Sequence, residues 1–130
     1  MKKKTWILSV VILILTILCA NLWQQKTANE NNLKVMCKSS VNSALEHFQV
    51  YDTDRKESDY IAGVAEFRTY MTAYLCLADE TSDTDYTWCN MLYGYMTLYP
   101  DKVKAHIPEL VDALTYLAED YRHPGGFQQI

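Results

Sequence analysis

The chain has 130 residues, a formal net charge of −4 at pH 7, 49% hydrophobic residues, and only four Gly and three Pro residues. This composition argues against a disordered or β-rich chain, and the length allows one small core rather than two. Residues 24–130 contain all 16 acidic residues but only nine of the 12 basic ones. Their net negative charge excludes nucleic acid and anionic lipid heads as ligands.

The N-terminal segment combines a basic start, residues 1–4, with an uncharged apolar run from Trp6 to Leu22 that is followed by Trp23. The two Trp residues are about 26 Å apart along a helix, which is close to the thickness of the hydrocarbon core. Trp also prefers the two membrane interfaces. We therefore expect residues 5–23 to be a single-pass anchor in the cell membrane. The positive-inside rule keeps the N-terminus in the cytoplasm and the remainder of the chain outside.

Two other interpretations of this segment stay open. In a cleaved secretory signal, Ala20 would be the last residue before the cut, but Leu18 would then occupy a position that favours small residues. In a lipoprotein, Cys19 would carry the lipid, although the bulky Leu18 precedes it. Both interpretations place the following residues on the same side of the membrane as the anchor does.

The predicted fold class is all-α: an N-terminal transmembrane helix, then a small antiparallel bundle of about four helices in residues 33–123. Residues 24–32 are a polar juxtamembrane spacer, either a linker or a helix continuous with the anchor, and residues 124–130 are a tail. The bundle prediction rests on apolar residues that recur at three- and four-residue steps. These are Leu33, Met36, Cys37, Val41, Ala44, Leu45 and Phe48; then Ile61, Val64, Phe67, Met71, Tyr74, Leu75 and Ala78; and finally Val103, Ile107, Leu110, Val111, Leu114, Leu117 and Tyr121.

Local signals set the expected helix boundaries. Asp54, with Glu57 three residues later, resembles the capping arrangement at a helix start. Ser82 or Asp83 is the expected cap of the third bundle helix. Pro108 either kinks the fourth helix or marks its true first turn, in which case the residues just before it form a short separate turn.

The third helical segment, residues 86–99, has no charged residue and carries apolar or aromatic groups on every side. A helix of this kind must be covered, and it is too short to cross a bilayer. One interpretation is that it is the central helix of the bundle. The other is that Trp88, Tyr93, Tyr95 and Tyr99 partly face a partner protein, because Trp and Tyr supply binding energy at interfaces.

Cys37, Cys76 and Cys89 each lie in a predicted apolar stripe. They are expected to be buried thiols, or one pair of them forms a bridge between helices. The chain lacks zinc-binding spacings, a calcium loop, a nucleophile elbow and a phosphate-binding Gly loop. We therefore predict no catalytic residue, no metal site and no cofactor.

The leading hypothesis is a membrane-anchored, extracytoplasmic helical module that binds a protein partner, as accessory subunits, inhibitors and immunity-type proteins do. The alternatives are a helical bundle with a small-molecule pocket lined by Trp88 and the tyrosines, and a secreted enzyme with no recognisable motif. A flat exposed aromatic patch would favour protein binding. An apolar cavity with converging polar groups would favour a small ligand.

Overall fold

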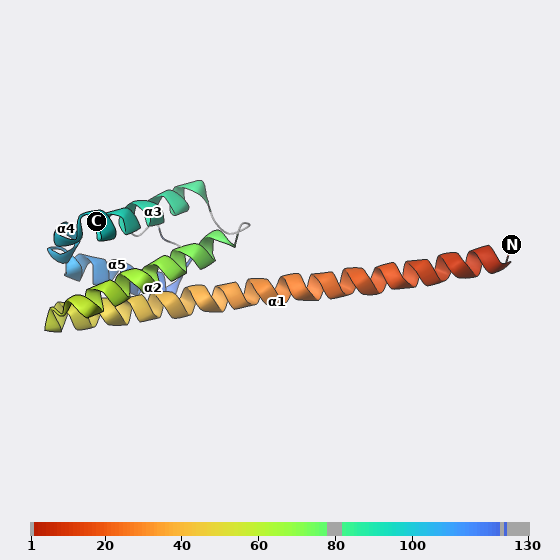
Figure 1. The fold of residues 1–130 in the computed structure, drawn as a ribbon, viewed down its shortest axis with the longest axis horizontal. Helices are drawn as coiled ribbons and strands as arrows, with labels where there is room; N and C mark the ends of the chain where they lie inside the picture. The colour runs from red at the N-terminus through yellow and green to blue at the C-terminus, as the bar shows by residue number, and fades with distance from the viewer. Residues whose placement is uncertain (1, 78–81, 123, 125–130) are drawn as a thin grey trace. The chain divides into compact units, whose positions relative to one another are not determined.

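The structure is a computed structural model, and it describes residues 2–77, 82–122 and 124. These residues form five α-helices: α1 (Lys2–Asp54), α2 (Glu57–Leu75), α3 (Asp83–Leu98), α4 (Pro100–Lys104) and α5 (Ile107–Glu119) (Figure 1). No strand occurs within the described ranges, so the all-α class is confirmed. The chain divides into two units, residues 1–32 and 33–130, and each is described by itself.

The first unit is the apolar N-terminal part of α1, which is long and apolar enough to cross a membrane. Nearly all of its apolar side chains are exposed. The Ser9 hydroxyl donates a hydrogen bond to the Thr5 carbonyl at 3.0 Å, and the Thr16 hydroxyl donates to the Ile12 carbonyl at 2.8 Å. Their donors are therefore satisfied within the helix. The polar residues 24–32 continue the same helix.

The core of the second unit combines one face of each helix. Its buried apolar residues are Cys37, Val41, Ala44, Phe48 and Tyr51 of α1; Tyr60, Phe67, Tyr70, Ala73 and Tyr74 of α2; Leu77; Cys89 and Met96 of α3; Val103 of α4; and Ile107, Leu110, Leu114 and Leu117 of α5. Within this unit, α2 runs back along the last turns of α1 (Figure 1). The Phe48 ring lies on Gly63, where a Cβ would be 2.8 Å from Phe48 Cζ. Gly63 therefore allows α1 and α2 to approach closely.

The connection between α1 and α2 does not use the predicted cap. Helix α1 continues to Asp54, and Arg55 then takes a left-handed conformation with φ of 55°. Lys56 is the extended N-cap residue of α2 and makes no side-chain capping bond. Asp54 is still helical and cannot cap α2, so its carboxylate instead pairs with Lys56 Nζ at 3.0 Å. The predicted capping role of Asp54 and Glu57 is therefore wrong.

The predicted starts of α3 and α5 are confirmed, whereas α5 ends at Glu119, before the predicted end of the bundle at residue 123. Ser82 caps α3, and its side-chain oxygen accepts a hydrogen bond from the Asp85 amide at 3.1 Å. Pro100 begins α4, and Pro108 lies in the first turn of α5. A Pro at that position lacks only an N–H that would have no helical partner anyway. The residues before Pro108 thus form the short separate element that the sequence offered as one alternative.

The buried face of α2 agrees with the predicted one only in part: Phe67 and Tyr74 are buried, as expected. Ile61 and Leu75, expected in the core, are 60% and 41% exposed, and Ala78 lies outside the described residues. The buried face contains Tyr60 and Tyr70 instead. Their hydroxyls donate to the carbonyls of Met96 at 3.0 Å and Tyr121 at 2.9 Å. Because their hydroxyls bond to backbone carbonyls, these tyrosines are buried at little polar cost.

The cysteines, all within the described ranges, are thiols. Cys37 and Cys89 are buried, as expected, and burial raises the pKa of the Cys89 thiol to about 12. Cys76 is exposed, so its predicted burial is wrong. It is the residue just after α2, where the apolar face of the helix has ended.

Candidate functional site

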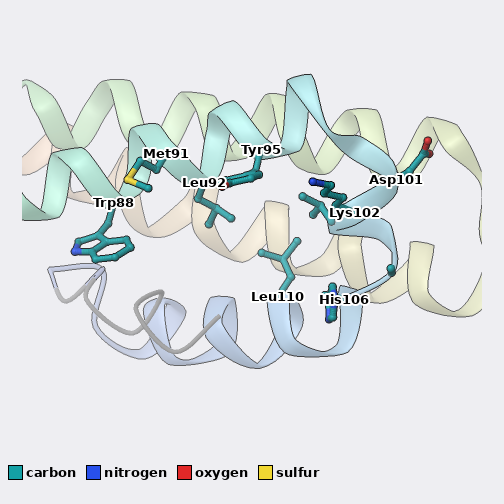
Figure 2. Close-up of a pocket in the computed structure, with 10 residues that line it drawn as sticks. Trp88, Met91, Leu92, Tyr95, Asp101, Lys102, His106 and Leu110 are labelled. Carbon is teal, nitrogen blue, oxygen red and sulfur yellow. The ribbon is translucent and has the colours of Figure 1, made fainter.

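The second unit contains a half-open groove with a volume of about 710 Å³, which we call the α3–α5 groove. It is lined by Trp88, Met91, Leu92 and Tyr95 of α3, Asp101, Lys102 and Val103 of α4, Ala105 and His106 of the α4–α5 connection, and Leu110 of α5. Figure 2 shows α3 and α5 on opposite sides of this groove, Trp88 toward one end, and Lys102 and His106 toward the other. The groove therefore has apolar walls and one polar end.

Contacts to α2 and to the α1–α2 connection hold α4, and with it the polar end, in place. Lys104 Nζ lies 2.7 and 2.8 Å from the two Glu57 carboxylate oxygens and 4.8 Å from the centre of the Tyr60 ring. The hydrogen bond to Glu57 raises the pKa of Lys104. Arg55 Nη1 also donates to the Lys104 carbonyl at 3.4 Å. The polar end of the groove is thus part of the folded unit.

Lys102 and its neighbour Asp101 differ in direction. Figure 2 shows the Lys102 side chain extending back along the groove toward Tyr95, whereas the Asp101 carboxylate points away. None of the ion pairs found among residues 2–77, 82–122 and 124 includes Lys102. Its Nζ instead lies 5.1 Å from the centre of the Tyr99 ring, a cation–π distance. The groove therefore carries one ammonium group that a ligand anion can reach.

His106 is the second polar group at this end. Its Nδ1 lies 3.4 Å from Glu109 Oε1 one turn further on. Glu109 has a lowered pKa because its own backbone N–H and the His106 ring hydrogen-bond to it. The imidazole is exposed and already has an acidic neighbour. It therefore offers a weaker attraction for an anion than Lys102.

An exposed apolar surface adjoins the groove along α3. We call it the α3 outer face, and it consists of Met91, Tyr95, Leu98 and Tyr99, which are 46%, 47%, 73% and 51% exposed. The Tyr95 and Tyr99 rings pack together with centroids 5.8 Å apart. Within α3 only Cys89 and Met96 are buried. The interpretation of this segment as a fully covered central helix is therefore wrong.

The structure brings together three of the four residues predicted from the sequence to bind a partner. Trp88 and Tyr95 line the groove, and Tyr99 packs on Tyr95 at its edge. Tyr93 is half-buried and packs against the core instead. The 100° step of a helix places Tyr93 on a different side from Tyr95.

Sequence reasoning missed several residues of the site. Met91 follows Trp88 by three residues and Leu98 follows Met91 by seven, so helical periodicity was a usable signal for both. Lys102, His106 and Leu110 had no such signal, because their places at the groove depend on how the chain turns from α3 into α4 and from α4 into α5. Within the described ranges, no group of three or more His, Cys, Asp or Glu side chains is arranged to hold a metal ion.

No family model, curated protein or solved structure matches this chain.

Proposed function

We propose that this chain is a membrane-anchored, extracytoplasmic helical bundle that binds a protein partner through the α3 outer face and the α3–α5 groove. The observation that carries the proposal is the continuity of these two features: Tyr95 belongs to both. A run of large apolar side chains that remains exposed beside a groove is typical of a surface that another protein covers. Accessory subunits, inhibitors and immunity-type proteins work by binding of this kind.

Three features support the anchor. The first unit is uncharged over residues 6–23, and its hydroxyls at Ser9 and Thr16 bond to carbonyls of the same helix, as hydroxyls in lipid require. Trp6 and Trp23 frame the segment at interfacial positions. The lysines at positions 2–4 then favour a cytoplasmic N-terminus. The second unit would lie outside as a compact antiparallel bundle.

The exposed residues favour a protein partner over a small ligand. A small ligand is usually buried by 70–90% in its pocket, so the pocket alone should contain the binding residues. Leu98 and Tyr99 are among the most exposed apolar residues of the second unit, yet they lie outside the groove lining. A partner segment that follows α3 would cover both of them together with the groove.

The dimensions favour a helical segment of that partner. Trp88 and Tyr99 are eleven residues apart, which corresponds to about 16 Å along α3. An amphipathic helix of about three turns has this length, and it binds a groove through anchors at i, i+3 or i+4, and i+7.

The test of the proposal separates stability from binding. Tyr95→Ala and Tyr99→Ala should leave the melting temperature of the bundle within a few degrees of the original, because both side chains are about half exposed. Both should abolish co-purification of a protein that accompanies the full chain from its own membrane. Tyr93→Ala is the matched control, since this Tyr packs against the core, and it should lower the melting temperature. If all three substitutions unfold the bundle, the α3 outer face is structural and the proposal fails.

The anchor has its own test. The full chain should remain with membranes after high-salt and alkaline washes. Mass spectrometry that finds an N-terminus at Asn21, or a lipid on Cys19, would replace the anchor with a cleaved signal or a lipoprotein.

A small amphiphilic ligand is the second candidate, because a volume of about 710 Å³ with apolar walls and a polar end lies within the range of ligand pockets. Trp88 is the only Trp beyond position 23. In a Trp6→Phe/Trp23→Phe background its fluorescence therefore reports on the groove. Saturable quenching or a blue shift on titration with dodecanoate, retained by Tyr99→Ala, would favour this candidate over the protein partner.

A further inference from the structure

The charge distribution around the groove differs between its two ends. At the end where Trp88 lies, Met91 and Leu92 supply apolar contacts. At the other end, Lys102 points along the groove and has no carboxylate partner among the described residues, while Asp101 points away. A ligand therefore meets a single accessible positive charge at one end.

We infer that the partner segment is an amphipathic helix with an acidic residue at the end that meets Lys102. This inference rests on the proposed function and names the chemistry of the partner. A carboxylate placed there would accept a hydrogen bond from Nζ and would add ionic attraction to a group that already lies against the Tyr99 ring. A basic residue at the same position would meet a like charge and lose the same attraction.

The net negative charge of this part of the chain limits how many acidic residues the partner segment can carry. Residues 24–130 contain 16 acidic and nine basic residues, so a strongly acidic partner would be repelled as it approaches. A partner helix with one acidic residue aligned with Lys102, on an otherwise apolar and uncharged face, is attracted to Lys102 without being strongly repelled by the acidic chain. Lys104, two residues further on, is held by Glu57 and does not compete for this carboxylate.

The test is a selection from a displayed library of random twelve-residue peptides on the full chain in lipid nanodiscs. Counter-selection uses the Tyr95→Ser variant, which removes half-exposed aromatic area from the groove. Enriched peptides should show apolar residues at helical spacing and an excess of Asp or Glu at one end. Their affinity should fall by at least about five-fold in Lys102→Glu, since an attractive pair becomes a repulsive one.

Lys38→Glu is the matched control, because it makes the same charge change at an exposed position of α1 outside the groove. It should leave peptide affinity unchanged. A selection on Lys102→Glu should in turn enrich Lys or Arg at the same end of the peptides.

The outcomes separate this inference from the proposed function. Amphipathic peptides that show no acidic preference, or that bind Lys102→Glu as tightly as the original chain, overturn the acidic-partner inference and leave the groove as a peptide site. Failure to enrich any peptide that distinguishes the original chain from Tyr95→Ser overturns the proposed function as well. An equal loss of affinity in Lys38→Glu would assign the effect to overall charge and also overturn the inference.

Discussion

The contact between Phe48 and Gly63 predicts different outcomes for the same Gly→Ala substitution at two helical positions. A Cβ added at Gly63 would lie 2.8–2.9 Å from three atoms of the Phe48 ring, whose side chain is fully buried. A Cβ added at Gly94, in the middle of α3, would meet nothing within 4 Å. Both positions are helical, so each gains the same helix propensity from Ala, about 1 kcal/mol. The difference between the two variants therefore isolates the contact between α1 and α2.

The magnitude follows from the cost of overpacking. Inserting a methyl group into a filled core costs about 1–3 kcal/mol, because Phe48 or the α2 backbone must move by several tenths of an ångström. Gly94→Ala should stabilise the bundle by about 1 kcal/mol. The free energy of unfolding of the Gly63→Ala variant should be about 1–3 kcal/mol lower than that of the Gly94→Ala variant. At about 4–8 °C per kcal/mol for a domain of this size, the gap is measurable by thermal melting.

The assay is circular dichroism melting of the full chain in nanodiscs. Phe48→Leu provides a double-mutant cycle, since a smaller side chain should remove the clash and make Gly63→Ala neutral or stabilising. Equal melting temperatures for Gly63→Ala and Gly94→Ala would refute the close approach of α1 and α2. An unchanged effect of Gly63→Ala in the Phe48→Leu background would refute the assignment of that contact to Phe48.

Three further predictions test the fold. Leu114→Ala should destabilise the bundle by about 2–5 kcal/mol because Leu114 is fully buried. Thr115→Ala, at the exposed neighbouring position, should change stability by less than about 0.5 kcal/mol. Similar midpoints of urea unfolding for the two variants would mean that α5 faces the other way. Arg55→Gly and Arg55→Ala lose the same side-chain contacts. The Gly variant should nevertheless be more stable than the Ala variant by about 1–2 kcal/mol, because residue 55 has a left-handed φ of 55°. Equal free energies of unfolding for the two variants would contradict the left-handed turn. At pH 8, iodoacetamide should modify the exposed Cys76 within minutes and Cys89 only after unfolding. The reason is that burial raises the pKa of the Cys89 thiol to about 12 from an ordinary value of 9.0. Equal modification rates for the two thiols, measured by peptide mass spectrometry, would contradict the burial of Cys89.

The helices themselves were largely readable from the sequence. Ser82 and Pro108 act locally, through an amide one turn away and through a missing N–H, so their roles needed no tertiary information. The face of α5 was also clear, because its buried positions are Leu and Ile on a regular stripe. The face of α2 was readable only in part. Its buried residues include Tyr60 and Tyr70, whose hydroxyls bond to the carbonyls of Met96 and Tyr121, and these long-range partners leave no local signal in the sequence.

The candidate site was predictable only in part for the same reason. Trp88, Tyr95 and Tyr99 share one side of α3, so their proximity follows from helical geometry. The groove needs a second wall, and Leu110 supplies it only because α4 and its connection to α5 turn the chain back toward α3. Lys102 belongs to α4, and α4 is joined to α2 by the contact between Lys104 and Glu57, residues 47 positions apart.

The most direct test of the proposed binding surface is site-specific photo-crosslinking in the native membrane. A benzophenone side chain would replace Leu98 on the α3 outer face in one variant and Ile61 on α2 in another, since both are apolar and at least 60% exposed. The proposal predicts a single protein adduct from position 98, lost when Tyr95→Ala is added, and no such adduct from position 61. Equal adducts from both positions, or none from position 98, would contradict a protein partner at the α3 outer face.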